Sequence, residues 1–215
     1  MILINKPLHW TSFDVVRNIR NLVKIKKVGH AGTLDPLASG LLIICTGKFT
    51  KKINEYMSRE KEYTGSITLG AITPTYDLES APMEYKDYNF VTIGLLEQTV
   101  KQFVGDIQQM PPVHSAIKQQ GKPVYLSARK GIEVVMQPRP VTIKKFEILS
   151  VELPVVTIRV VCTTGTYIRS LANDFGAALG CGGYLSSLCR TRIGEFTIND
   201  AMSIEEFAEV IKSLG

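Results

Sequence analysis

One acidic residue stands alone in a glycine-rich stretch near the N-terminus. The segment GHAGTLDPLASG, residues 29–40, contains Asp35 as its one acid, followed directly by Pro36. Glycine permits positive φ and close approach of the backbone to a ligand, and a proline disfavours the α conformation for the residue before it. The pattern therefore predicts a lone carboxylate on a stiff loop. It is either a functional group or the cap of a short helix whose first residue is Pro36.

Arg169 is the second residue whose position suggests chemistry. The pattern predicts that it lies in the first turn of a helix, where a cation opposes the helix dipole by a few tenths of a kcal/mol. We interpret it as facing an anion, either a phosphate or the carboxylate of Asp35. An arginine within ~4–6 Å would lower an aspartate pKa by about 1–3 units. Local pairing with Asp174 and simple solvation are the alternatives.

Three further side chains have a structural and a functional interpretation each. Tyr63 follows a charged pair in a predicted strand, so it is either a core aromatic or a stacking surface for a base. Tyr167 has the same two interpretations. His30, between Gly29 and Ala31, either contacts a phosphate or orients the loop.

The elements that must position these residues follow from hydrophobic spacing. A helix is predicted with Ser12 as its N-cap, and strands are predicted over Leu41–Thr46 and Lys61–Gly70. In the second strand Tyr63, Gly65, Ile67 and Leu69 share one face. A helix marked by Leu96, Val100, Phe103 and Val104 follows, with Gly94 weakening its start.

The C-terminal half shows a strand and two helices. Val155–Cys162 reads as a buried strand, followed by a helix from Ile168 to Leu179 that Gly180 should end. Ser203 and Glu206 form a capping box for a last helix. Residues 106–131 show no sustained period, and an insert of this kind inside a compact domain is usually functional or mobile.

Composition limits the class of protein. At 215 residues the chain is long enough for one sizeable core. The sequence has no secretory signal and no apolar run approaching ~18 residues, so we expect a cytoplasmic protein. Its four cysteines are widely spaced without a CxxC pair, which favours reduced thiols over a zinc site or a disulfide framework.

Basic residues are concentrated in two regions. Residues 17–61 carry ten basic side chains against three acids, a net charge of +7, and residues 101–145 carry eight against two, a net charge of +6. Residues 195–215 have a net charge of −4. This asymmetry indicates a polyanionic partner such as nucleic acid, with simple solvation as the alternative.

Taken together, these segments resemble the TruB family of pseudouridine synthases. The resemblance is carried by HAGTLDPLASG, by KEY at Lys61–Tyr63 and by TGTYIRSLAND at Thr164–Asp174. The segments NKPLHWTSFDVV, MPPVHSAIKQQGKPVYLSARKG and LCRTRIGEF match too. The motifs occur in the family's order and cover nearly the whole chain.

The resemblance implies an α/β (α+β) fold with a mixed, largely antiparallel, curved sheet flanked by helices. It implies a single catalytic domain over residues 1–215, with an RNA-gripping insert at about 106–131 and without a C-terminal PUA module. The implied reaction converts the T-loop uridine of tRNA, at position 55, to pseudouridine after base flipping. Asp35 would be the nucleophile, paired with Arg169, and Tyr63 would lie under the flipped base.

The resemblance also assigns binding residues and partners. His30 would contact the RNA beside the extruded nucleotide, and Lys6 and Tyr167 would line the pocket. In the insert, Lys118, Lys122, Arg129 and Lys130 would grip the T stem and loop. The reaction needs no cofactor or metal, and we expect a monomer without a membrane or an obligate protein partner. His9, where the family usually has glycine, and Cys189, where arginine is common, depart from the pattern.

Two other functions remain open from sequence. A non-catalytic chaperone that opens and refolds tRNA would need the basic insert but not Asp35. A guide-dependent synthase within a ribonucleoprotein is disfavoured by the short chain.

Overall fold

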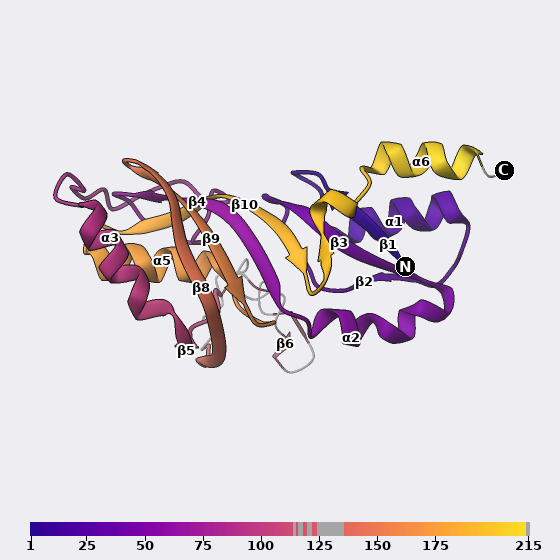
Figure 1. Cartoon of the computed structure of the whole chain (residues 1–215), viewed down its shortest axis with the longest axis horizontal. Helices are drawn as coiled ribbons and strands as arrows, with labels where there is room; N and C mark the ends of the chain where they lie inside the picture. The colour runs from indigo at the N-terminus through magenta and orange to yellow at the C-terminus, as the bar shows by residue number, and fades with distance from the viewer. Residues whose placement is uncertain (114, 116–117, 120–121, 124–135, 214–215) are drawn as a thin grey trace. The chain divides into compact units, whose positions relative to one another are not determined.

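The computed structural model describes residues 1–113, 115, 118–119, 122–123 and 136–213 (Figure 1). Within these residues the elements are β1 (Ile2–Lys6), α1 (Ser12–Val23), β2 (Val28–His30), β3 (Ala38–Thr46), η1 (Gly47–Lys52), α2 (Ile53–Met57), β4 (Lys61–Leu69), α3 (Ile93–Val100), η2 (Lys101–Phe103), β5 (Gly105–Gln109), β6 (Lys118–Gln119), β7 (Lys122–Pro123), β8 (Arg139–Glu152), β9 (Val155–Cys162), α5 (Ile168–Leu179), β10 (Gly183–Ile193), β11 (Phe196–Thr197), η3 (Ile198–Asp200) and α6 (Ile204–Ser213).

The chain divides into two compact units. The first comprises Met1–Thr64 and Ser187–Gly215, and the second comprises Gly65–Ser186. In the first unit β3 is the central strand, with β1 and β2 pairing antiparallel to it. The end of β10 pairs parallel to β3 and antiparallel to β11.

Strand β3 is buried on both faces, and this explains its long apolar run. Leu42 and Ile44 pack with helices α1 and α6 in one cluster, while Leu41 and Ile43 pack with Tyr56 in another. All four β3 side chains are fully buried. Because complete burial of such a side chain contributes roughly 1.5–3 kcal/mol, β3 is the core strand of this unit.

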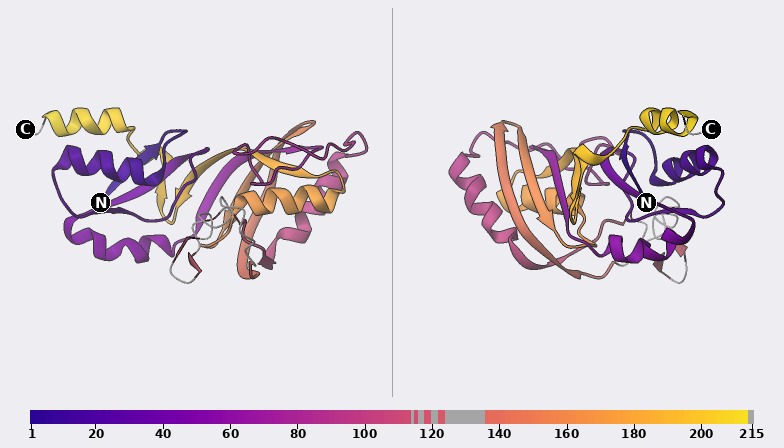
Figure 2. Two further views of the ribbon diagram at one scale, coloured as in Figure 1. Left: turned by 180° about the vertical axis from the view of Figure 1, so that it is seen from behind. Right: turned by 45° about the vertical axis from the view of Figure 1, so that its right-hand side comes forward.

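The second unit is built on the antiparallel strands β5, β8 and β9. Helices α3 and α5 pack against each other beside this sheet (Figures 1 and 2). Phe146 of β8 contacts Phe175 of α5 with ring centroids 5.3 Å apart, and Phe103 of η2 contacts both rings. These aromatic contacts fix α5, the helix that carries Arg169.

The order of the larger sheet is β1-β3-β10-β4-β9-β8-β5, so β4 lies between β10 and β9. By their residue ranges, β4 and β10 belong partly to each unit. Among the described residues, the pairs β1–β3, β2–β3, β5–β8 and β8–β9 are antiparallel, and β3 with β10 is parallel. The expected mixed, largely antiparallel sheet flanked by helices is confirmed.

Several elements predicted from spacing are confirmed. The strand over Lys61–Leu69 buries every second residue, beginning with Lys61. Helix α5 ends at Gly180, whose φ is 84°. The capping box before α6 is present, since the N–H of Ser203 donates to Glu206 and the N–H of Glu206 donates to Ser203. All four cysteines are free, and three of them are buried.

Other predictions are wrong or incomplete. Thr11, not Ser12, caps α1, because its hydroxyl accepts from the N–H of Asp14 and its own N–H donates to the Asp14 carboxylate. The segment expected to lack regular structure begins within strand β5. Strands β1, β8 and β10 were not predicted. The two long strands, β8 and β10, mix polar and apolar residues on both faces.

Gly40 supplies a test of the first unit. It lies in β3 with φ of 106°, and a Cβ there would come within 2.6 Å of the backbone nitrogen of Arg190. We expect Gly40→Ala to lower the free energy of unfolding by at least about 2 kcal/mol, through positive-φ strain and overlap. Gly94→Ala is the control, since a Cβ at this helical position meets nothing within 4 Å. Equal urea midpoints for Gly40→Ala and wild type would contradict the prediction.

Candidate active site

Asp35 lies at the start of a turn that joins β2 to β3. Its carbonyl accepts a hydrogen bond of 3.0 Å from the N–H of Ala38, and no helix follows Pro36. The interpretation of Asp35 as a helix cap is therefore wrong. The residue is partly exposed, in contrast to the buried residues Leu34 and Ala38. The turn therefore holds the backbone of this partly exposed acid in place.

The start of α1 holds one side of this turn. The Ser12 hydroxyl donates to the carbonyl of Leu34 (3.1 Å) and accepts from its N–H (2.9 Å). The N–H of His9 donates to the carbonyl of Pro36 at 2.7 Å. His9 has a φ of 65°, a backbone conformation that glycine adopts readily. Histidine tolerates positive φ better than most other residues, so it can occupy this position. Both residues flanking Asp35 are thus hydrogen-bonded: Leu34 to the first residue of α1 and Pro36 to the segment before it.

Arg190 of β10 holds the other side. Its Nε donates to the carbonyl of Leu41 (2.8 Å), Nη2 to that of Gly32 (3.1 Å) and Nη1 to that of Thr33 (3.4 Å). The side chain is 1% exposed. These three carbonyls lie on both sides of Asp35 in sequence, so one guanidinium spans the whole loop. Arg190 is the residue that most directly fixes the loop's shape.

Lys6 is a second buried cation in the same region. Its Nζ donates to the carbonyls of Pro7 (2.8 Å) and Trp10 (2.7 Å), and the side chain is fully buried. Burial lowers the Lys6 pKa to about 8, attraction to Asp35 opposes this shift, and repulsion from Arg190 adds to it. Near neutral pH the amine is therefore charged and attracts the Asp35 carboxylate.

The two cations occupy one row across three strands. Lys6 of β1 pairs with Gly40 of β3, and Gly40 pairs with Arg190 of β10. Two buried like charges repel, and removing each from water costs several kcal/mol. The backbone carbonyls and the charge of Asp35 offset that cost. We call Lys6, Gly40 and Arg190 the cation row.

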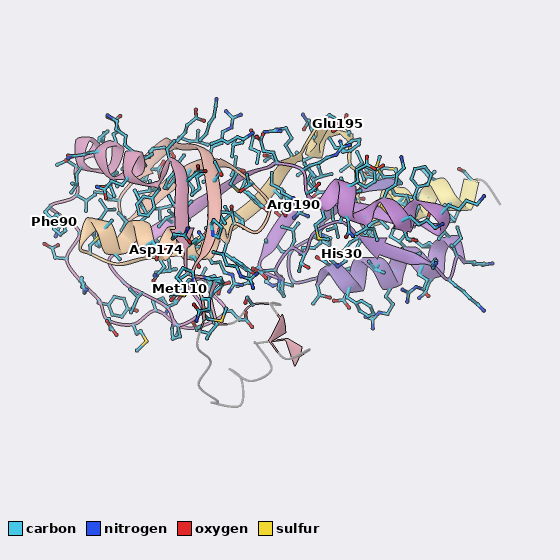
Figure 3. The ribbon with its side chains drawn as sticks, turned by 90° about the horizontal axis from the view of Figure 1, so that it is seen from below. His30, Phe90, Met110, Asp174, Arg190 and Glu195 are labelled. Carbon is cyan, nitrogen blue, oxygen red and sulfur yellow. The ribbon has the colours of Figure 1, made fainter. Side chains whose placement is uncertain are left out.

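His30 lies at the end of β2, near Arg190, and both are labelled in Figure 3. Burial lowers the His30 pKa below its usual 6.5, with repulsion from Arg190 adding to the effect and a hydrogen bond with Gly32 opposing it. At neutral pH the imidazole is therefore uncharged. It is suited to hydrogen bonding rather than to pairing with a phosphate as a cation.

Tyr63 lies on the buried face of β4 and is 9% exposed. Its face also carries Lys61, Ile67 and Leu69. The predicted face assignment is confirmed.

Arg169 and its neighbours form a second site within the other unit. The side chain is 4% exposed, with its Nε 3.5 Å from Oδ2 of Asp77 and its Nη1 donating to the carbonyl of Thr75 at 3.1 Å. Asp77 follows Tyr76, whose φ is 64°. Positive φ in a bulky residue is costly and persists where surrounding structure imposes it. The partner of Arg169 that the structure gives in this unit is Asp77, not Asp174.

The N-terminus of α5 is fixed by the residues at the end of β5. Gln109 accepts from the N–H of Tyr167 (2.8 Å) and donates to its carbonyl (3.0 Å). The Ser170 hydroxyl donates to the carbonyl of Met110 at 2.8 Å. Tyr167 is thus held by its backbone, directly before the helix that carries Arg169.

The predicted RNA-gripping residues are described only in part. Lys118 and Lys122 lie in strands β6 and β7, which form a two-stranded sheet. Arg129 and Lys130 lie outside the described residues.

Sequence reasoning missed Arg190, Ser12 as a contact of the loop, and Asp77. Arg190 lies in the segment LCRTRIGEF, which carried the resemblance, but nothing local marks its guanidinium as buried. Asp77 lies 92 residues before Arg169, so only tertiary structure reveals their pairing. The sequence did offer one signal for the position of Arg190. Gly40 lies next to a predicted strand, and glycine there is typical of a place where another backbone approaches closely.

Comparison with known proteins agrees with this architecture. Residues 20–168 match the TruB family pseudouridylate synthase N-terminal domain, and residues 169–213 match the tRNA pseudouridylate synthase B C-terminal domain. The chain belongs to the TruB family of pseudouridylate synthases.

Similar curated proteins span nearly the same length. The tRNA pseudouridine synthase B of Flavobacterium johnsoniae is 48% identical to this chain. The match covers 99% of this chain and 96% of the Flavobacterium protein. That of Parabacteroides distasonis is 49% identical, with coverages of 99% and 93%. Among solved structures, one chain in a Cbf5-Nop10-Gar1 complex matches with a TM-score of 0.76 and 31% identity, and this chain spans 53% of it.

In the described part of the chain, no group of three or more histidine, cysteine, aspartate or glutamate side chains is arranged to hold a metal ion. No described helix has the length and apolar character needed to cross a membrane.

The buried amine of Lys6 gives a testable pH effect. Its folded-state pKa of about 8 lies below the ordinary 10.5, so between these values the native state binds fewer protons than the unfolded state. The contribution of Lys6 to unfolding free energy should therefore rise with pH across this window, by at most about 3 kcal/mol. An NMR titration of labelled lysines should show one signal with a midpoint near pH 8 that is missing in Lys6→Met. Midpoints above pH 10 for every lysine would refute this.

Proposed function

We propose that this protein isomerises the T-loop uridine of tRNA, at position 55, to pseudouridine, with Asp35 as the nucleophile. The observation that carries the proposal is the partly exposed Asp35 on a turn held by Ser12, His9 and Arg190. Family membership over residues 20–213 supports the reaction class. The similar proteins are named tRNA pseudouridine synthase B, which supports tRNA as the substrate.

The chemistry requires a carboxylate but no change of oxidation state. The N1–C1′ bond of the uridine breaks, the uracil turns, and a C5–C1′ bond forms. The C5 proton is lost, and N1 gains a proton. Bond cleavage develops positive charge on the sugar, which a carboxylate captures or stabilises. Lys6, by attracting the negative charge of Asp35, favours its ionised form before substrate binds.

Arg169 and Asp77 supply the second part of the proposal. We assign Arg169 as the partner of Asp35 in the RNA-bound enzyme, in agreement with the resemblance. Asp77 and the Thr75 carbonyl orient the guanidinium, which is buried and would be costly to leave without acceptors. Asp77 is thereby a positioning residue, because it acts through Arg169.

The remaining site residues are assigned to the nucleotide. Tyr63 lies under the flipped base, and neutral His30 contacts RNA beside it by hydrogen bonding. Lys6 and Tyr167 support the pocket. Lys118, Lys122, Arg129 and Lys130 grip the T stem and loop. The protein acts as a cytoplasmic monomer without a cofactor.

The two competing functions predict different results. A chaperone would not need Asp35, whereas the proposed enzyme does. The Cbf5-Nop10-Gar1 complex contains further proteins by name. If this chain acted in a guide-dependent way and needed such partners, the purified protein alone would be inactive. Conversion of an isolated T-arm hairpin by the purified chain alone would exclude that role.

Asp35→Asn tests the proposed chemistry. We expect tritium release from tRNA labelled at C5 of uridine to fall by more than about a thousandfold, because the amide cannot act as a nucleophile. Binding of tRNA should change less than threefold. Asp87→Asn, at an exposed acid in another loop, should leave both unchanged. Equal release from wild type and Asp35→Asn would remove Asp35 from the reaction.

Arg190→Lys tests whether the loop must be held in shape. Lysine keeps the positive charge but cannot reach three carbonyls in a planar fork. We expect kcat to fall about 10- to 100-fold with the KM for tRNA nearly unchanged, as small displacements of a catalytic group cost this much. The control is Arg192→Lys on the same strand, where the arginine pairs with Glu60. Unchanged kcat in a folded Arg190→Lys protein would contradict the assignment.

A further inference from the structure

Six exposed lysines gather at the end of the first unit opposite the Asp35 turn. They lie on two segments: one follows α1 and the other forms η1. The hydrogen bond from the N–H of Gly47 to the carbonyl of Lys27 (2.8 Å) and the pairing of Val28 with Thr46 join these segments. We call this set the lysine surface: Lys24, Lys26, Lys27, Lys48, Lys51 and Lys52.

The lysine surface is not neutralised by neighbouring acids. Among the described residues, none of the six lysines has a carboxylate within ion-pair distance. The next acid along the chain, Glu55, pairs with Arg59. Charges of one sign held this close repel each other, which favours a polyanionic ligand.

Two apolar side chains lie among these lysines. Phe49 is 46% exposed and Ile25 is 40% exposed. This apolar area is small, whereas a helix that inserts into a membrane interface presents a continuous apolar face. The chemistry of the surface is therefore mainly that of phosphate binding. Lysine contacts phosphates as a point charge and carries little base specificity.

The distance between the lysine surface and the Asp35 turn limits which part of a bound ligand the lysines can contact. Strand β3 runs from Ala38, beside the turn, to Thr46, beside the lysines. At about 3.3 Å per residue, its ends are about 26 Å apart. The lysines therefore do not contact the nucleotide at Asp35 but lie within reach of the paired region that follows it.

We propose that the lysine surface binds phosphates of a paired stem of the same RNA whose looped-out uridine reaches Asp35. This inference rests on the proposed function and adds a second contact, in the first unit, to the insert expected to grip the T arm. Proteins recognise duplex RNA mainly through its backbone and shape. Contacts of this kind therefore add affinity without sequence preference. The surface should affect binding rather than chemistry.

The test removes three of these charges and compares the result with an equal loss elsewhere. The variant is K26Q/K27Q/K48Q, and the control is K86Q/K101Q/K212Q, at three other exposed lysines. The dissociation constant for unmodified tRNA is measured between about 50 and 200 mM salt. Each lost phosphate contact lowers the slope of log K against log salt by about 0.7–0.9. We expect a slope lower by about 2, binding at least tenfold weaker at the lowest salt, and kcat at saturating tRNA within twofold of wild type.

Three results would overturn the inference. One is equal dissociation constants and slopes for the variant and the control. Another is a loss of kcat at saturation in the variant with unchanged binding. The third is loss of binding to phosphatidylserine vesicles with tRNA binding intact, which would assign the surface to a membrane.

The proposed function fails independently of this result. The proposed function fails if wild-type protein releases no tritium from labelled tRNA. The binding measurements decide the role of the lysine surface whether or not tritium is released.

Discussion

The burial of two cations beside one glycine is the constraint on which the shape of the Asp35 turn depends. Lys6 and Arg190 flank Gly40 in adjacent strands, and both side chains are nearly or fully buried. A buried cation is tolerated only when fixed acceptors surround it, and here most of them are backbone carbonyls of the turn itself and of the segment before α1. The cost of leaving Arg190 without acceptors therefore opposes rearrangement of the turn, and the same cost for Lys6 opposes rearrangement of the segment before α1. Glycine suits position 40 because φ is positive there and a Cβ would overlap the backbone of Arg190 in β10.

This arrangement gives Asp35 a fixed position before any RNA binds. Catalysis benefits from such preorganisation, since a group that is already oriented and charged need not reorganise during the reaction. The second unit prepares its own charged group in a similar way. Asp77 and the Thr75 carbonyl hold the Arg169 guanidinium, and Gln109 fixes the start of its helix. Each half of the proposed chemistry is thus built on local contacts that can be tested separately.

From the sequence alone Asp35 and Arg169 could be proposed as site residues and the strand of Tyr63 could be predicted, because each lies in a segment with a strong local pattern. Alternation fixed the buried face of β4, and Gly180 marked the end of α5. The cation row was not predictable in this way, since its members come from β1, β3 and β10, which are 34 and 150 residues apart in the chain. A buried arginine also has no local signature, because arginine is usually exposed. Asp77 was missed because its partner, Arg169, is distant in sequence. Thr11 rather than Ser12 caps α1, and the buried Ser12 hydroxyl is instead hydrogen-bonded to Leu34.

The central claim is that the Asp35 carboxylate lies beneath the sugar of an everted uridine. A crystal structure of the Asp35→Asn protein bound to an unmodified T-arm RNA measures this directly. The account predicts that the side-chain amide oxygen of the substituted residue lies about 3–3.5 Å from C1′ of the target nucleotide, with the Arg190 contacts to the turn unchanged. A target uridine that remains stacked in its loop, or one whose C1′ lies far from the substituted side chain, would contradict the account.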